Sequence, residues 1–299
     1  MLRSLPPVAL AALGVLLLSA MDAVIKHLAA EHSVLAITFG RYVFGAVAAF
    51  AIWNGAGRPR IDGEMIRAHT FRGALIVVVA LSFFYALSVL PLAEAITLAF
   101  VAPLLVPFFA WAVAGERPRP SSLAACVLGF IGALIAVQTS TSATHDPDRL
   151  LGVVAVLISA AAYAWALALL RTRADKDGAP SVGLLQTLIP CAIVAGPAIA
   201  LSPMPALDAL PWFALMGTLG ASGWYVLIVA YGRTQAQNLA PLDFTSLIWA
   251  SAFGYFLFAE TPPAQLFLGA ALIVVACLYA AWDERRAAPA PAPQTPVAD

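Results

Sequence analysis

The segment PVALAALGVLLLSAMDAVIKHLA, residues 7–29, is apolar through most of its length and carries Asp22 and Lys26 near its end. A helix needs about 20 mainly apolar residues to cross the hydrocarbon core of a bilayer, and this segment is long enough. The two opposite charges lie four residues apart, which places them on one face of a helix. The segment therefore predicts a membrane-spanning helix with two charged residues on one face near its C-terminal end.

Segments of the same kind recur along the whole chain. Of its 299 residues, 62% are hydrophobic and 11% charged, and the mean hydropathy is +0.90, which is outside the range of ordinary soluble domains. Ten apolar runs can be separated, and they predict helices at about 7–29, 34–53, 71–89, 92–113, 121–138, 150–170, 181–201, 211–231, 239–258 and 263–282. Because the first run includes charges and is repeated nine times, we interpret it as a retained helix rather than a cleaved signal peptide.

The basic residues are divided unevenly between the two sides that ten helices would define. If the N-terminus is cytoplasmic, thirteen of the sixteen Lys and Arg residues fall on the cytoplasmic side. They are Arg3, Arg58, Arg60, Arg67, Arg72, Arg117, Arg119, Arg171, Arg173, Lys176, Arg233, Arg285 and Arg286. Lys26 and Arg149 remain outside, and Arg41 lies within the second run. Because cytoplasmic loops are enriched in Lys and Arg, both termini are predicted to be cytoplasmic in a bacterial inner membrane.

Two segments resemble each other at a long distance in the sequence. One, from Gly115, reads GERPRPSSLAACVLGFIGALIAV, and the other, from Ala259, reads AETPPAQLFLGAALIVVACLYAA and begins 144 residues later. Near the same offset Arg41 aligns with Gln186. The first five predicted helices therefore correspond to the last five.

Each predicted half contains an odd number of helices, so the halves must enter the membrane in opposite senses. Two inverted halves can exchange conformations and give a site near the membrane midplane access to each side in turn. Duplication kept only for packing is the alternative. The resulting organisation is a first five-helix repeat at 1–138, a periplasmic connection at 139–149, a second five-helix repeat at 150–282 and a disordered cytoplasmic tail at 283–299.

Several longer segments have a characteristic order of small, apolar and charged residues. In the first half they read VIKHLA (24–29), TFGRYVFGA (38–46) and YALSVLPLAEAITLAFVAPLLVPFFAWAVAGERP (85–118), and in the second half APLDFTSLIWASAFGYFLFAETP (240–262). In these segments the chain resembles the EamA-type members of the drug/metabolite transporter superfamily. The resemblance extends over the chain up to its tail. It implies a central cavity between the halves and membrane transport, and families of this kind include inner-membrane exporters of amino acids and other metabolites.

Polar and aromatic residues recur at helical spacing on the otherwise apolar helices. Unpaired polar groups are costly in hydrocarbon, so these faces are expected to point into the bundle. The residues predicted to line an aqueous cavity and bind substrate are Asp22, Lys26, Arg41, Ser82, Tyr85, Glu94, Thr97, Ser159, Tyr163, Thr218, Ser222, Tyr225, Thr245 and Trp249. The alternative is that Ser and Thr bond back to their own helices while the aromatic residues fill the core.

The ionisable members of this set admit two roles each. Asp22 and Lys26 either neutralise each other or form an outer gate, or a contact for a zwitterion whose ammonium and carboxylate would meet them. Arg41 either binds substrate or ties helices together and caps carbonyl groups. Glu94 is either a favourable charge at a helix N-terminus or a substrate or proton residue.

Prolines lie inside the predicted fourth and seventh helices and at the start of the ninth: Pro103, Pro107, Pro190, Pro197 and Pro241. Proline removes a backbone hydrogen bond, so we predict hinges at Pro103, Pro107 and Pro241, with the fourth helix as the moving element, and breaks in the seventh helix. The glycines of GTLGASG (217–223) would let the eighth helix approach a neighbour closely.

Other classes of function lack the residues that they need. The sequence has no GxxxxGK[ST] phosphate-binding loop and no HExxH or Cys/His cluster, so no cofactor or metal is predicted. Ser222 lies in a GASG pattern similar to that of intramembrane serine proteases, but the four histidines fall at helix ends or in loops, away from it. The three cysteines lie far apart in apolar runs, so no disulfide is predicted.

We therefore predict an all-α membrane protein of ten transmembrane helices, not an enzyme, that exports small organic metabolites by alternating access. Amino acids or their analogues are the predicted substrates, the lipid bilayer is a partner, nucleic acid is not, and a monomer is expected. Import of a nucleotide-like or cofactor metabolite is one alternative. A membrane receptor or scaffold that transports nothing is the other.

Overall fold

The computed structural model is a helical bundle in the residues that it describes, which are 5–115, 120–137, 147–171, 173, 177–203, 205–231 and 242–287. Its helices are α1 (Pro7–Leu28), α2 (Val34–Gly55), α3 (Gly63–Val89), α4 (Leu92–Ala99), α5 (Ala102–Ala114), α6 (Pro120–Val137), α7 (Pro147–Arg171), α9 (Ala179–Leu201), α10 (Leu210–Tyr231), α12 (Ser246–Phe258) and α13 (Ala264–Ala287). No strand occurs in these ranges, so the all-α prediction is confirmed for them.

Six spans are long and apolar enough to cross a membrane, namely α1, α2, α3, the α4–α5 pair, α7 and α9. Shorter apolar stretches occupy α6, α12 and α13. Large apolar side chains on the outer faces are exposed, among them Leu201, Phe256 and Leu268. A continuous apolar exterior of this kind is unfavourable in water and suited to lipid.

Two helices extend beyond their predicted bounds. α3 begins at Gly63 instead of residue 71, because the Asp62 side chain caps it by accepting a hydrogen bond of 2.8 Å from the backbone N–H of Met65. Its first turns carry charged residues, so hydropathy does not detect them. α13 likewise continues through 283–287, which were predicted to belong to the disordered tail.

The predicted helix at 92–113 is divided into two. α4 ends at Ala99 and α5 begins at Ala102, with Pro103 in the first turn of α5, where the absence of its N–H is tolerated. The chain is therefore interrupted just before Pro103, and the hinge at that residue stays a prediction. Pro107 lies within α5 and does not end it. At the break Phe100 packs edge-on against Phe244, with ring centroids 5.1 Å apart.

The other proline predictions had different outcomes. Pro190 and Pro197 were expected to break the seventh helix, but α9 is one helix from Ala179 to Leu201, so this prediction was wrong. Its neighbours hold it in place, since α9 packs along both α2 and α3. Pro241 lies outside the described residues.

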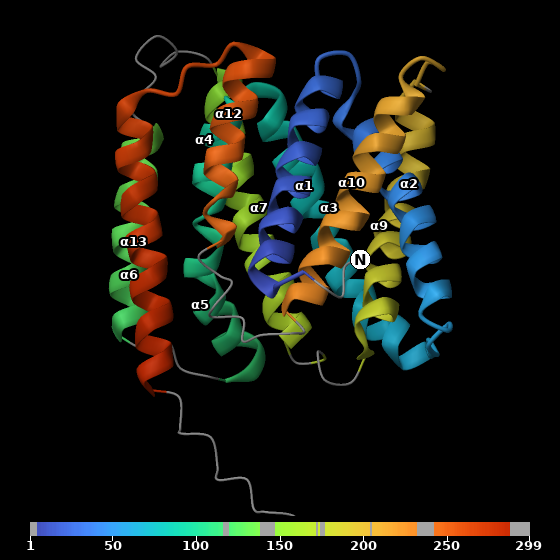
Figure 1. Ribbon diagram of the computed structural model, residues 1–299, viewed down its shortest axis with the longest axis horizontal. Helices are drawn as coiled ribbons and strands as arrows, with labels where there is room; N and C mark the ends of the chain where they lie inside the picture. The colour runs from blue at the N-terminus through green and yellow to red at the C-terminus, as the bar shows by residue number, and fades with distance from the viewer. Residues whose placement is uncertain are drawn as a thin grey trace, which may run out of the picture.

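The helices pack in pairs that combine one early and one late segment: α1 with α10, α2 with α9, α3 with α7, α4 with α12 and α6 with α13. In Figure 1 α6 and α13 stand together at one side of the bundle, and α2 and α9 at the other. In the predicted repeat α1 corresponds to α7 and α3 to α10. The α1–α10 pair of the structure therefore corresponds to the α7–α3 pair.

Glycines permit the closest of these contacts. A Cβ atom added to Gly217 of α10 would lie 2.8 Å from the backbone nitrogen of Gly45 on α2. One added to Gly132 of α6 would lie 2.7 Å from the carbonyl oxygen of Gly269 on α13. Because the obstructing atoms belong to the backbone, a side chain could be accommodated only by separating the helices. The close approach predicted for 217–223 is confirmed.

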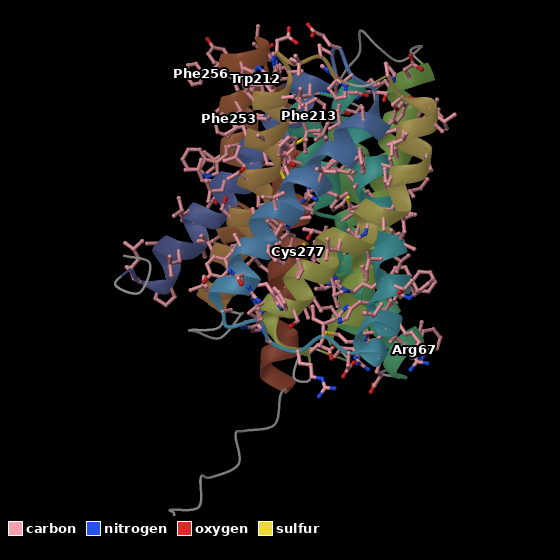
Figure 2. The ribbon with its side chains drawn as sticks, turned by 90° about the vertical axis from the view of Figure 1, so that its right-hand side faces the viewer. Arg67, Trp212, Phe213, Phe253, Phe256 and Cys277 are labelled. Carbon is pink, nitrogen blue, oxygen red and sulfur yellow. The ribbon has the colours of Figure 1, made fainter. Side chains whose placement is uncertain are left out.

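The two ends of the bundle differ in charge. We call basic end the one that carries the α2–α3 and α7–α9 connections, with Arg58, Arg60, Arg67 and Arg173. The opposite end carries the α1–α2, α3–α4, α9–α10 and α12–α13 connections. Figure 2 shows Arg67 at the basic end and Trp212 and Phe256 at the opposite end.

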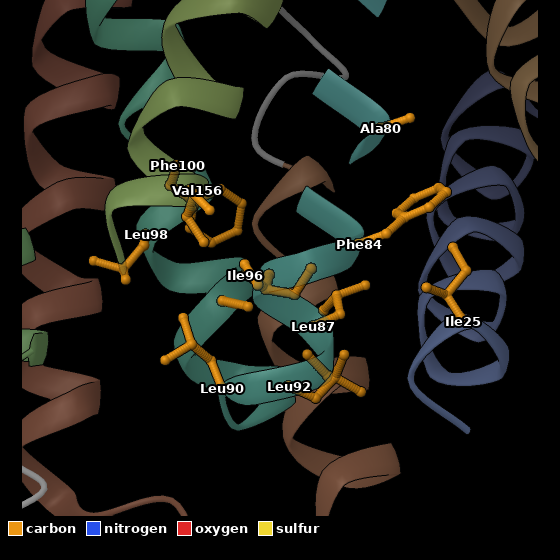
Figure 3. Close-up of a cluster of buried hydrophobic side chains, with 14 of the residues drawn as sticks. Ile25, Ala80, Phe84, Leu87, Leu90, Leu92, Ile96, Leu98, Phe100 and Val156 are labelled. Atoms are coloured by element: carbon orange, nitrogen blue, oxygen red, sulfur yellow. The ribbon is translucent and has the colours of Figure 1, made fainter. Parts of the chain in front are cut away.

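The main apolar core lies toward the opposite end, between α1, α3, α4 and α7. Its fully buried members include Ile25, Leu87, Leu92 and Leu98, and Val156 of α7 packs with them (Figure 3). This solid core closes one side of the bundle interior and leaves the space nearer the basic end for a cavity.

Candidate solute-binding cavity

A cavity of about 470 Å³ lies between α1, α2, α3, α7, α9 and α10. It extends from Met21 and Asp22 on α1 to Leu170 at the end of α7 and to Gly178 and Pro180 at the start of α9. The cavity therefore reaches the basic end. Its volume falls within the range of roughly 300–1,000 Å³ that small-molecule sites occupy.

Asp22 and Arg41 are the charged side chains in this lining, as far as the structure describes the chain. Asp22 lies one turn before Lys26 on α1. Arg41 lies two turns into α2, whose start is fixed by Ser33, which accepts a hydrogen bond from the backbone of Ala36. Across the described ranges neither side chain forms a direct ion pair, with the other or elsewhere. Arg41 is nevertheless near enough for its charge to act on Asp22.

The guanidinium of Arg41 is held by soft contacts. Its Nε donates to the sulfur of Met21 at 3.4 Å, and its Cζ lies 4.9 Å from the ring centre of Tyr42 and 5.9 Å from that of Phe84. A Cβ atom at Gly220 would lie 2.8 Å from the Met21 sulfur and 3.6 Å from Arg41 Nη2. A thioether, two rings and the absence of a side chain on α10 thus position this charge.

The rest of the cavity wall is aromatic or aliphatic, with a few neutral polar groups. It includes Phe83, Tyr163, Gln186, Thr187, Trp224 and Tyr225. Rings supply large apolar surfaces, and the Tyr hydroxyls and the Trp N–H can still bond to a polar ligand. Such a lining suits a small solute with an apolar body and a few polar groups.

A buried polar network lies beside the cavity near the basic end. Both terminal nitrogens of Arg72 donate to Gln186 Oε1, at 3.2 and 2.9 Å, and its Nε donates to His69 Nδ1 at 3.2 Å. Because a guanidinium can only donate, Nδ1 is the acceptor and the other ring nitrogen, Nε2, carries the proton toward Asp177, 2.9 Å away. The network joins α3, α9 and the α7–α9 connection.

Arg173 completes this network at the surface. Its Nε and Nη2 donate to the two carboxylate oxygens of Asp177 at 3.0 and 3.1 Å, and its Nη1 donates to Glu64 at 2.9 Å. The hydrogen bonds from Arg173 hold the pKa of Asp177 below its usual value of 3.8. The α7–α9 connection is thereby tied to the start of α3 beside the mouth of the cavity.

Ion pairs close the opposite end. Lys26 Nζ lies 2.9 Å from Glu260 Oε1 and donates to the carbonyl oxygens of Leu90 at 2.5 Å and Leu87 at 3.3 Å. Glu260 Oε2 accepts a hydrogen bond of 2.8 Å from the backbone N–H of Leu92. These contacts join α1, the α3–α4 turn and the α12–α13 connection, and we call them the Lys26–Glu260 clasp.

A second ion pair lies on the same end. Arg149 Nη2 of α7 lies 2.6 Å from Glu94 Oε1 of α4, and Glu94 is 3% exposed. A carboxylate this buried needs a partner, and Arg149 supplies one. The two ion pairs and the apolar core thus lie at the opposite end from the mouth of the cavity.

The predicted site residues divide into two groups. Asp22, Arg41, Tyr163 and Tyr225 line the cavity. The other predicted members, which were also expected there, lie outside it: Lys26, Ser82, Tyr85, Glu94, Thr97, Ser159, Thr218, Ser222, Thr245 and Trp249.

Each residue outside the cavity has a physical reason for its place. Lys26 and Glu94 belong to the ion pairs just described. Five hydroxyls donate to carbonyl groups three or four residues earlier on their own chain, which is the alternative weighed for the sequence: Ser82, Thr97, Thr218, Ser222 and Thr245. Ser159 donates across to Val79 of α3, while Tyr85 and Trp249 pack against apolar clusters.

Sequence reasoning missed several lining residues. Met21, Tyr42 and Trp224 are apolar or amphipathic, so nothing in an apolar helix distinguishes them from core residues. A signal for Gln186 existed, because the internal repeat aligns it with Arg41, and both line the cavity.

The part of the chain that the structure describes offers no metal site, since no three His, Cys, Asp or Glu side chains are placed to share one ion. Cys126, Cys191 and Cys277 are separate free thiols. The interactions available in the cavity are charge pairing, hydrogen bonding and contact with aromatic rings.

Comparison with known proteins gives one family and several relatives. The model of the EamA-like transporter family matches twice, at residues 5–138 and 150–282. The S-adenosylmethionine uptake transporter of Rickettsia bellii is 24% identical over 90% of this chain and 91% of its own length. The riboflavin transporter of Brucella anthropi is 29% identical over 81% of this chain and 86% of its own length. The pseudopaline exporter of Pseudomonas aeruginosa is 26% identical over 91% of this chain and 94% of its own length. A solved crystal structure with 20% identity superposes with a TM-score of 0.65, covering 94% of this chain and 98% of that one.

Proposed function

Because the chain belongs to the EamA-like transporter family, and is thus a multi-pass membrane transporter, we propose that it carries small organic metabolites by alternating access. The observation that supports this mechanism is the cavity, which reaches the basic end while the Lys26–Glu260 clasp and the core close the other. A site that is open to one side and sealed from the other is one of the two states that alternating access requires.

We propose that the moving parts are two inverted halves of five membrane spans each, ten in all, at 1–138 and 150–282. The two family matches support this division. The packing supports it too, because exchanging the halves turns the α1–α10 pair into the α7–α3 pair. The break before Pro103 gives the first half a place to bend.

The orientation that we propose places both termini, and therefore the basic end, in the cytoplasm of a bacterium. The excess of Lys and Arg on that side supports it. The cavity then faces the cytoplasm, and the clasp faces outward. One chain suffices for this mechanism, because helices of a single copy surround the cavity.

We propose amino acids or their analogues, moved outward, as the substrates. One acid, one base and several aromatic rings in the lining support a small amphipathic solute with charges of both signs. Import of a nucleotide-like or cofactor metabolite is the second candidate, favoured by the relatives that are named for S-adenosylmethionine uptake and riboflavin transport. A receptor that transports nothing is the third.

Flux through liposomes tests these alternatives. The full chain is reconstituted, the vesicles are loaded with labelled L-phenylalanine, S-adenosylmethionine or riboflavin, and efflux is compared with that from protein-free vesicles. We expect phenylalanine to leave faster than leak and unlabelled amino acids to compete. Flux of the larger metabolites alone would favour the second candidate, and binding of any of the three without flux would favour a receptor.

A further inference from the structure

We propose that Asp22 and Arg41 form a two-charge recognition site in which Asp22 binds the cationic group of the solute and Arg41 binds its anionic group. The inference rests on the proposed transport function and assigns roles to two residues of its cavity. It differs from one of the roles drawn from the sequence, in which Lys26 would meet the solute's carboxylate.

Lys26 is already engaged and is not available to a solute. Its ammonium has three partners, Glu260 and the carbonyl oxygens of Leu87 and Leu90, and these use the three donors that a Lys side chain has. It also lies outside the cavity lining. A solute in the cavity therefore meets another cation, and Arg41 is the one present in the described lining.

Arg41 has donors left for a solute. A guanidinium has five N–H donors, and here one of them makes a weak contact to the Met21 sulfur. Across the described ranges the other donors have no hydrogen-bonded partner, although the side chain is partly buried. The ring of Tyr42 and the space at Gly220 hold the guanidinium in place. A positioned, unpaired guanidinium matches the geometry of a carboxylate, which it can bind through two parallel hydrogen bonds.

The carboxylate of Asp22 has no hydrogen bond or ion pair in the part of the chain that the structure describes. A carboxylate in a largely apolar wall is costly unless it is paired. The charge of Arg41 reduces this cost without removing it, and it does not contact the carboxylate. An ammonium group in the cavity would supply both the hydrogen bonds and the charge that Asp22 lacks.

The two residues act together because they come from neighbouring turns of different helices. Asp22 belongs to α1 and Arg41 to α2, and Met21 links them, since it precedes Asp22 and its sulfur contacts Arg41. A solute that carries both charges on one carbon satisfies both residues at once. Its side chain then lies toward Trp224 and Tyr225, where the apolar wall distinguishes size rather than charge.

The test uses three probes that share one skeleton: L-phenylalanine with both charges, phenethylamine with the cation only and 3-phenylpropionate with the anion only. Binding to the full chain in lipid nanodiscs is measured for each. We expect L-phenylalanine to bind at least about tenfold more tightly than either single-charge probe, since a hydrogen bond to a charged group is worth roughly a factor of ten or more.

Two variants separate the roles. Asp22→Asn should weaken the binding of L-phenylalanine and phenethylamine by about tenfold or more and leave the binding of 3-phenylpropionate unchanged. Arg41→Gln should weaken the binding of L-phenylalanine and 3-phenylpropionate and leave the binding of phenethylamine unchanged. Glu31→Gln and Arg67→Gln, which each remove one exposed charge outside this cavity, serve as controls and should bind all three probes normally. A misfolded variant would lose every probe, so the retained probe reports intact folding.

Several outcomes would overturn the assignment. They are equal affinity for the three probes, loss of binding of all three by a variant whose thermal unfolding shows that it is folded, and failure of both L-phenylalanine and the smaller L-serine to bind. Flux is measured in parallel. Equal binding of the three probes together with flux would contradict the roles of Asp22 and Arg41 but not the transport function. Loss of different probes in the two variants without any flux would contradict the transport function but not these roles.

Discussion

Weakening the Lys26–Glu260 clasp should open the end of the bundle that it closes. Glu260→Gln keeps the shape of the side chain, but its single oxygen can accept from Lys26 or from the backbone N–H of Leu92 and not from both, and the negative charge that faces Lys26 is removed. A hydrogen bond to a charged group is worth about 1.5–3 kcal/mol and a neutral one about 0.5–1.5. The sealed state should therefore lose about 1–2 kcal/mol, which raises the population of the open state by a factor of about 5–30.

Labelling of a buried thiol measures this shift. Ala86 lies next to the Leu87 carbonyl that Lys26 contacts and is 0% exposed, so Ala86→Cys places a small reporter beneath the clasp. The three native cysteines are first replaced by alanine. A membrane-impermeant maleimide should then modify the reporter about 5–30 times faster in Glu260→Gln than in the parent, if opening limits the reaction.

The matched control is Glu31→Gln, which removes an exposed carboxylate at the same end without touching the clasp. Its labelling rate should equal that of the parent. Equal rates in Glu260→Gln and the parent, or acceleration by Glu31→Gln to the same extent, would refute the view that this ion pair seals the cavity.

Three further perturbations follow from the packing, the cavity wall and the surface network. Gly217→Ala places a methyl group against the backbone of α2 and should destabilise the detergent-solubilised protein by about 1–3 kcal/mol in thermal unfolding, whereas Gly196→Ala, which has open space, should not. Tyr163→Ala and Trp224→Ala should reduce flux several-fold, and Tyr85→Ala and Trp249→Ala, whose rings lie outside the cavity, should not; equal effects in all four would displace the site. Because the folded state lowers the pKa of Asp177 below 3.8, its contribution to stability is complete above that pH and is lost as the pH falls further; Asp177→Asn should flatten this acid dependence of the melting temperature.

The sequence was sufficient for most of the architecture because one physical requirement dominates it. In hydrocarbon every backbone group must be satisfied within its own helix, so long apolar runs become helices whatever their neighbours are. The requirement ends where charged residues begin. The start of α3 was missed for this reason, since the Asp62 cap fixes it, and so was the extension of α13 through charged residues to Ala287.

The site was predicted less well because a polar residue on an apolar helix can satisfy its hydrogen bonds in more than one way. Thr97 and Thr218 satisfy themselves on their own helices, which no sequence pattern distinguishes from facing a cavity. Pairing of Lys26 with Asp22, its neighbour on α1, was one of the two roles drawn from the sequence, but its partner is Glu260, which lies across the bundle and is available only after folding. The internal repeat carried unused information, since Gln186 is the counterpart of Arg41.

The missing side chain at Gly220 has a consequence for how selectivity could change. Arg41 contacts the sulfur of Met21, which packs against Gly220 of α10, and no acidic side chain among the described residues forms an ion pair with it. A single methyl group at position 220 would displace this sulfur, because a Cβ atom there would lie 2.8 Å from it, while Arg41 stays in ordinary contact at 3.6 Å. Substrate preference could thus be changed by one methyl group on α10, through the thioether that contacts Arg41.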